Sequence, residues 1–251
     1  RASPPALVTD AHMSPEALFA PTWTGYVAYC VGFFVRYFLL AGTAYWLLHV
    51  RWRDFFLRFR VQKPLPGHAQ VRREIGWTVL NTACSGLSTL VLYALVQSGY
   101  TRLYFDLAEY GLAYAAASVV LGVVAYDAWF YWQHRLLHTG WLLRHAHHVH
   151  HRSTNPTVFA AFAHHPIETF LGNAYFVLLP VLVPIHPLAF GLVGAILLCV
   201  SLAAHSGYEF LPPGFTRGRW TRWLGTSTHH NMHHRHFSCN YGIVFNVWDR
   251  L

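Results

Sequence analysis

Three long apolar runs limit what this chain can fold into. They cover residues 26–50, 77–98 and 110–132, and each is close to the roughly 20 residues that a helix needs to cross a bilayer. The whole chain is 54% hydrophobic and 11% charged, whereas soluble domains usually carry about 25% charged residues. Such a chain has too little polar surface to face water on all sides. We therefore expect an all-α, polytopic integral membrane protein with three long transmembrane helices.

A fourth apolar region, residues 168–204, is interrupted by Pro180, Pro184 and Pro187. Proline breaks or kinks a helix because it lacks the backbone N–H and its ring clashes with the preceding turn. This region is predicted to form a proline-broken helical hairpin. The sequence does not decide whether the hairpin crosses the bilayer.

The basic residues are distributed in a way that tests this layout. Cytoplasmic loops of membrane proteins are enriched in Lys and Arg, and 15 of the 18 such residues here fall within the three segments 51–73, 135–152 and 217–250. The expected helices place all three segments on one side, which we interpret as the cytoplasmic side. No nucleic-acid-binding signature accompanies the net charge of +8, so anionic lipid is the better partner and nucleic acid is not expected.

We expect one membrane domain over residues 1–251. An N-terminal extension covers residues 1–25, transmembrane helices occupy 26–133, and a histidine-rich region covers 134–251, including the hairpin 168–204. The last region is predicted to form a cytoplasmic helical cap.

Histidine is the unusual residue of this chain, and most of the 19 histidines lie between His134 and His236. His134 and His138 are four residues apart, so on one helix they share a face and can reach the same metal ion. Two further clusters each have the spacing i, i+3, i+4, which also converges on one helical face. Their members are His147, His150 and His151, and His230, His233 and His234.

Chance is a poor explanation for these patterns, because a given spacing of this kind is expected only about 0.1 times in a chain of this composition. Eight imidazoles exceed what one ion with an open position needs, so two metal ions are predicted. Neutral imidazole suits zinc, copper, iron and nickel alike. The ligand type therefore leaves the metal open.

From Asp127 onward the chain resembles the fatty acid hydroxylase/sterol desaturase superfamily of membrane di-iron enzymes. The resemblance is carried by short motifs. They are Asp127 to His138, His147 to His151, His165-Pro-Ile-Glu168, His205-Ser-Gly, His230 to His234, and Asn240-Tyr241-Gly242.

This resemblance implies a centre of two iron ions, O2 as co-substrate, and hydroxylation or desaturation of a C–H bond in a fatty acyl, sterol or related membrane lipid. Zinc is a possible substitute in purified protein. The resemblance also suggests His205 as a ninth ligand, although Ser201 stands where relatives often have another histidine. The expected location is a bacterial inner membrane or the endoplasmic reticulum.

An external electron donor is also implied, of the cytochrome b5, ferredoxin or reductase type. The chain has no Rossmann glycine fingerprint and no cysteine cluster with which to reduce its own metals.

Four further residues are candidates for supporting positions. Asp127 lies seven residues before His134, on the same helical face, where it can orient a ligand. Glu168 is a second candidate for orienting a ligand. His165 and His229 are secondary metal-ligand candidates, for which hydrogen bonding is the simpler interpretation.

Two other functions compete with the oxygenase interpretation. A zinc or iron transporter usually holds its ions near mid-membrane between repeats, whereas these clusters lie at helix ends and no repeat is evident. A zinc hydrolase is the second, but the chain has no His-Glu-x-x-His motif.

Overall fold

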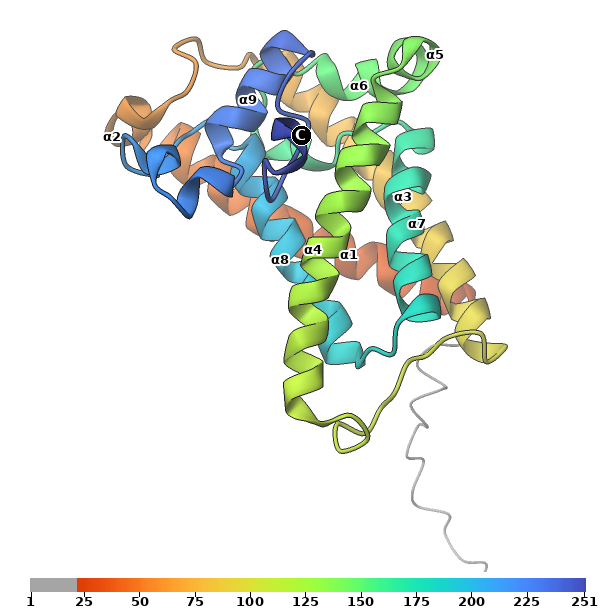
Figure 1. Ribbon diagram of the computed structural model, residues 1–251. Coiled ribbons are helices and arrows are strands. Elements are labelled where there is room, and N and C mark those ends of the chain that lie inside the picture. The colour runs from red at the N-terminus through yellow and green to blue at the C-terminus, as the bar shows by residue number, and fades with distance from the viewer. Residues whose placement is uncertain (1–21) are drawn as a thin grey trace, which may run out of the picture.

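The computed structural model describes residues 22–251, and the part of the chain that it describes is helical, with only isolated β-bridges. The long helices are α1 (Trp23–Trp46), α3 (His68–Gln97), α4 (Gly111–Leu137), α7 (Pro166–Leu182) and α8 (Pro187–His205). The shorter helices α2 (Arg53–Phe56), α5 (Gly140–Leu142), α6 (His148–His151) and α9 (Ser227–His236) gather at one end (Figure 1). The predicted all-α membrane fold is confirmed. Most of the expected extension 1–25 lies outside the described residues.

Two of the long helices, α3 and α4, extend beyond the apolar runs from which they were predicted. Helix α3 begins at His68, nine residues before the run at 77, and α4 continues past 132 to Leu137. A helix does not stop where the bilayer stops, because its backbone hydrogen bonds are internal and continue through polar sequence. This continuation carries His134 on the last turn of α4.

The proline-broken region forms two helices, α7 and α8, that run in opposite directions (Figure 1). The N–H of Arg102, in the loop between α3 and α4, donates to the carbonyl of Pro180 at 2.6 Å, and Leu103 forms a parallel bridge with Ile185. The turn between α7 and α8 therefore lies at the same end as the α3–α4 loop, opposite α9 (Figure 1). Helix α8 is itself long and apolar enough to cross a membrane, as are α1, α3 and α4. The hairpin thus extends through the apolar part of the molecule.

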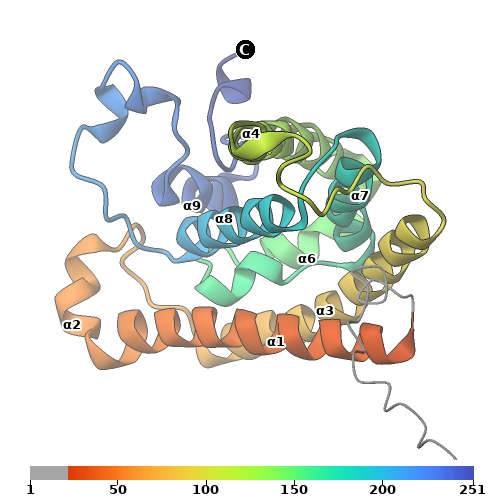
Figure 2. The ribbon, with the colours of Figure 1, turned by 90° about the horizontal axis from the view of Figure 1, so that it is seen from below.

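A short 3-10 helix, η5 (Val158–Phe162), lies between helices α1 and α3 on one side and α8 on the other. It packs on α1, α3 and α8 in the main hydrophobic cluster. Tyr37 of α1 is fully buried there, and its hydroxyl lies 3.1 Å from the carbonyl oxygens of both Val158 and Phe159. Seen from below, α1 lies along one edge of the molecule, and α4 lies on the far side of α8 (Figure 2). The η5 segment therefore connects α1 and α3 with α8 through its packing, and it lies between α6 and α7 in the chain.

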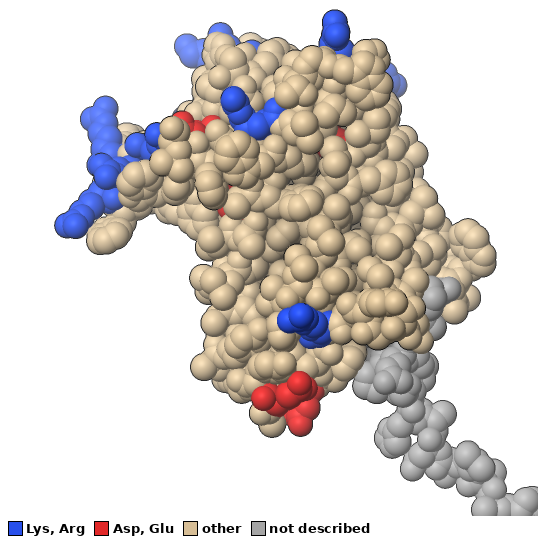
Figure 3. All heavy atoms as spheres, turned by 45° about the vertical axis from the view of Figure 1, so that its right-hand side comes forward, with Lys and Arg blue, Asp and Glu red and all other residues tan. Residues whose placement is uncertain are grey.

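Charge is separated along the molecule. Figure 3 shows Lys and Arg side chains gathered at the end that carries α2 and α9. On the same face, the opposite end shows a small basic patch beside an acidic one, where the α3–α4 loop holds Arg102, Asp106 and Glu109. Between them the visible surface is almost free of charge, as expected for a belt in contact with lipid.

Close packing of α1 on α3 gives a test of this arrangement. A Cβ added at Gly86 would lie 2.6 Å from Tyr26 and 2.7 Å from the sulfur of Cys30, whereas one added at Gly76 meets nothing within 4 Å. We expect Gly86→Ala to lower the thermal unfolding midpoint of the detergent-solubilised protein by roughly 2–10 °C, since overpacking is destabilising. Gly76→Ala is the control, and should leave the midpoint unchanged or raise it slightly because alanine favours helix. Equal midpoints in both variants would contradict the packing.

Candidate metal centre

Four separate segments deliver histidines to one end of the bundle. His134 lies on the last turn of α4, and His138 is the residue that caps this helix. A π-helical turn, η4 (Leu143–His147), runs directly into α6 and presents the second cluster. Helix α8 ends at His205, and α9 carries the third cluster. The i, i+3 and i+4 spacings thus act through short helical pieces and helix ends.

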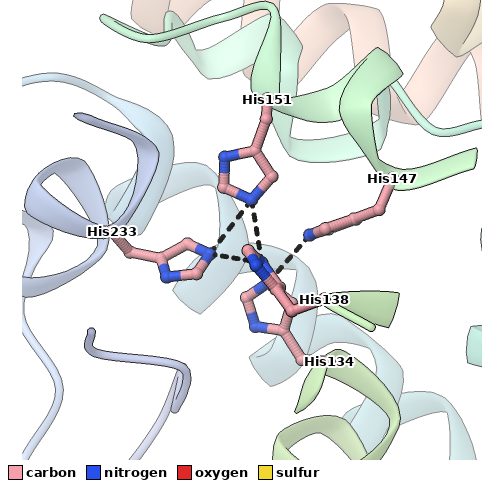
Figure 4. A group of neighbouring side chains, drawn as sticks. All are labelled: His134, His138, His147, His151 and His233. Atoms are coloured by element: carbon pink, nitrogen blue, oxygen red, sulfur yellow. Dashed lines mark hydrogen bonds between the residues drawn. The ribbon is translucent and has the colours of Figure 1, made fainter. Parts of the chain in front are cut away.

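Five histidines form the first group, and their ligand nitrogens all lie within 4.8 Å of one another. They are His134, His138, His147, His151 and His233. Figure 4 shows the five rings pointing toward a common centre from α4, η4, α6 and α9. The Nε2 atoms of His134 and His147 are 3.0 Å apart, and that of His151 is 3.1 Å from those of both His138 and His233.

The second group contains His150, His205, His230 and His234, all buried. The Nε2 atom of His205 lies 2.9 Å from that of His230 and 3.3 Å from that of His150. His150 and His151 are adjacent in sequence but belong to different groups. The two groups are therefore neighbours along α6.

The other ring nitrogens show why these contacts favour a metal. His134, His233 and His205 each place Nδ1 against a backbone carbonyl, of Tyr241 (2.8 Å), Cys239 (2.6 Å) and Ser201 (2.8 Å) respectively. A carbonyl only accepts, so Nδ1 carries the proton and Nε2 presents a lone pair. Lone pairs that converge at about 3 Å repel unless a cation lies between them. These rings are therefore held in the tautomer that binds a metal.

Burial keeps the imidazoles neutral. It lowers the pKa of His147 to about 3, and that of His233 to about 3 with a contribution from His138. It likewise lowers the pKa of His138 to about 3, and nearby His147 adds to this effect. Neutral imidazole is the form that coordinates metal ions. The site is thus composed of neutral nitrogen donors at physiological pH.

Glu168 is the carboxylate closest to the groups. Its Oε2 lies 3.0 Å from Nδ1 of His147, and its Oε1 lies 3.6 Å from Nε2 of His164. His164, His150 and Glu168 also form a third group whose potential ligand atoms lie within 4.8 Å of one another. The sequence prediction missed His164 and favoured its neighbour His165. Nothing in the spacing distinguishes these two adjacent residues.

Asp127 supports the site indirectly, through backbone hydrogen bonds. It is buried on α4, and its Oδ1 accepts hydrogen bonds from the backbone N–H groups of Val244 and Phe245, both at 3.0 Å. This fixes the segment that follows α9, which supplies the Tyr241 carbonyl to His134. Asp127 therefore contacts backbone near the ligands and does not join a ligand group.

His165 and His229, the two secondary metal-ligand candidates, lie outside the three groups of potential ligands. The Nδ1 atom of His165 accepts from the N–H of Ile167 and caps α7. His229 lies on the first turn of α9, with Nδ1 3.3 Å from the hydroxyl of Thr226. His229 precedes His230 on α9, and adjacent positions on a helix differ by about 100° around its axis, so the two residues lie on different faces.

Comparison with known proteins agrees with this geometry. A model of the family named "Fatty acid hydroxylase" matches residues 119–251. The chain is 31% identical over 223 residues to lathosterol oxidase of Homo sapiens, covering 88% of this chain and 71% of that protein. It is 27% identical over 222 residues to a Delta(7)-sterol 5(6)-desaturase of Schizosaccharomyces pombe, covering 86% and 71%. The chain belongs to the fatty acid hydroxylase family. No solved structure matches it.

Family membership confirms the class of function expected from the motifs. The protein is an oxygen-dependent oxidoreductase that hydroxylates or desaturates a membrane lipid, and the histidine groups fit a metal centre. A metal transporter is not supported.

Glu168 permits a test of the metal centre that leaves every histidine in place. We expect Glu168→Gln to weaken metal binding by roughly 10–100-fold, because the carboxylate beside His147 makes that ligand more basic and fixes its ring. The measurement is metal retained against a graded chelator. Glu109→Gln, in the exposed loop at the opposite end, is the matched control. Chelation curves that coincide for the two variants would show that Glu168 does not act on the metal.

Proposed function

We propose that the two histidine groups hold two iron ions and that the protein uses O2 and two electrons to desaturate a sterol-type lipid. The observation that carries this proposal is the pair of ring-nitrogen groups beside a single cavity. When bound, iron would supply the O2 chemistry that removes hydrogen from an unactivated C–H bond. The chain itself fixes the ligands and positions the substrate.

The ligand set supports two ions. The first group offers five nitrogens and the second four. A single ion that keeps one coordination position open for substrate binds fewer than nine ligands. Iron is favoured over zinc because oxidation of a C–H bond requires a redox-active metal, and zinc has no accessible redox change. Zinc bound in purified protein would then be a substitute.

The cavity beside the histidines fits an apolar substrate. His134, His147, His150 and His205 line one part of it, and apolar or aromatic side chains line much of the rest. Among these are Tyr126, Phe130, Phe176, Leu197 and Leu198. A lipid lying in this cavity would place a C–H bond next to the ring nitrogens. Its apolar walls would also exclude water from the reacting atoms.

A sterol-type substrate is supported in two ways. Relatives are named lathosterol oxidase and Delta(7)-sterol 5(6)-desaturase. The cavity also has a polar side, formed by Asn81, Thr169 and Asn173. A polycyclic lipid with one hydroxyl group would match both the apolar walls and these hydrogen-bonding side chains. The names of these desaturases also support desaturation as the reaction.

The electrons would come from a separate protein. The described cysteines are free and scattered, at Cys30, Cys84, Cys199 and Cys239, so they hold no cluster. Arg144, Arg152 and Arg235 are exposed on or next to the segments that supply histidines. An acidic carrier of the cytochrome b5 or ferredoxin type, or a reductase, would be attracted to this end of the molecule.

We also propose that the histidine end faces the cytoplasm. Its support is the basic charge at that end, which agrees with the positive-inside rule (Figure 3). We expect a reporter fused after Leu251 to be active when it is a cytoplasmic type and silent when it requires export. The reverse reporter pattern would show that the histidine end faces the opposite side of the membrane.

Loss of single ligands tests the chemistry. In cells that lack their own sterol 5(6)-desaturase, we expect the unmodified chain to convert Δ7-sterol to the 5,7-diene. His150→Ala and His233→Ala should each reduce product by at least about 100-fold, because an ion that loses a ligand is bound weakly. His236→Ala is the matched control, since His236 is exposed on the same helix as His233. Sterol analysis by mass spectrometry measures the outcome.

Metal analysis of the same purified variants tests the number of ions. The unmodified chain should bind two iron ions. His150→Ala and His233→Ala each change one histidine group, and each variant should retain about one iron ion. Product formed without O2 would contradict the oxidative mechanism and favour a hydrolase.

A further inference from the structure

Helices α4 and α7 form a wall with two different faces. On the inner face, Tyr126 and Phe130 of α4 and Phe176 of α7 line the cavity beside the histidines. The outer face is a separate groove between the same two helices. Its lining residues are Ala125, Ala128, Trp129, Trp132, Gln133 and Leu136 of α4, with Leu171, Tyr175, Leu178, Leu179, Leu182 and Val183 at or near α7.

The outer groove opens toward lipid. Apart from Gln133, its lining is apolar or aromatic, and Trp132 and Leu182 are exposed by 61% and 64%. Helix α4 is one of the candidate membrane spans. An apolar hollow at this depth is filled by the hydrocarbon of a membrane lipid, because water has no hydrogen-bonding partners there.

Gln133 is the residue that lines both the groove and the cavity. Opposite it on α7 is Gly172, which also lines the cavity, and a Cβ added there would lie 3.7 Å from Oε1 of Gln133. Glycine has no side chain, so at this point Gln133 provides the side chain between the two helices. Gln133 is the one lining residue that the two hollows share, and its side chain can rotate.

The Gln133 amide is unusual in a second respect. Among the described residues it forms no hydrogen bond, although the nearby Trp129 indole donates to the carbonyl of Leu171 at 3.2 Å. An unpaired polar group in a membrane helix is unfavourable and commonly marks a functional position. No hydrogen bond has to be broken for this side chain to rotate.

We propose that the α4–α7 groove is the route by which the sterol-type substrate passes sideways from the bilayer into the cavity, and that Gln133 is its gate. Rotation of Gln133 past Gly172 joins the groove to the cavity. The substrate's apolar body then extends from the histidines into the groove. This inference rests on the proposed function for the identity of the substrate. Sideways access spares the lipid a transfer through water, which is strongly unfavourable for a large apolar body.

Three variants test the gate through sterol product formed in cells. Gly172→Leu should close the wall and reduce product by about ten-fold or more, equivalent to about 1.4 kcal/mol. Gln133→Ala removes the gate side chain and should leave the groove open to the cavity. The double variant should recover most of the product lost in Gly172→Leu, because removal of the amide makes room for leucine. Iron content should remain at the unmodified level in all three.

Gly191→Leu is the matched control, because it makes the same change at an exposed position on α8 that no atom approaches within 4 Å. It should behave as the unmodified chain. Full activity in Gly172→Leu would contradict the proposal that Gln133 is a gate. So would a loss of product that Gln133→Ala does not reverse while iron is retained, since this would indicate a packing defect.

A photoreactive cholesterol analogue tests access without any turnover. In nanodiscs, the unmodified protein should be labelled both in the groove at Trp132 and in the cavity at Phe130 or Phe176. Gly172→Leu should keep the groove label and lose the cavity label. Equal cavity labelling in both proteins would mean that the groove holds bystander lipid only. If the proposed reaction were wrong, no sterol product would form from the unmodified chain, yet the labelling would still report the route.

Discussion

The structure depends on one electrostatic constraint, the convergence of imidazole lone pairs in a dry interior. His134, His205 and His233 have their Nδ1 protons committed to backbone carbonyls, so their Nε2 atoms present only lone pairs. Rings held in this way repel each other until a cation joins them. Two of these carbonyls belong to the segment after α9, at Cys239 and Tyr241. That segment must therefore fold back onto α4, and Asp127 of α4 holds it there by accepting from two backbone N–H groups. Asp249 accepts from the N–H groups of Tyr241 and Gly242 within the segment.

Helical geometry made much of the candidate ligand set predictable. His134 and His138 lie one turn apart, and this spacing places two rings together whatever the rest of the fold does. The same rule grouped His147, His150 and His151, but it identifies only a shared face. The structure divides these three between two groups, because the partner of each ring is decided by distant helices α8 and α9. His205 has no periodic neighbour, so it was recognised only through resemblance to a family.

Other features depend on how helices meet in space, which periodicity does not describe. The proline-broken hairpin was ambiguous until the contact between Arg102 and Pro180 placed its turn at the far end of the molecule. His164 and the closeness of Glu168 to His147 arise from the packing of α7 against η4. The position of Gln133 in the lining of both hollows, next to Gly172, likewise depends on how α4 and α7 pack.

The polar side of the cavity follows from the cost of placing polar groups at membrane depth. Asn81 donates to Thr169 at 3.0 Å and accepts from Ser85, and Asn173 donates to Ser85 at 3.0 Å. Such residues are unfavourable in lipid unless they are paired, and this chain of hydrogen bonds between α3 and α7 pairs them. Apolar packing alone would hold the two helices without that cost. Retaining polar side chains in the cavity wall therefore favours a substrate with a hydroxyl group over a plain hydrocarbon chain.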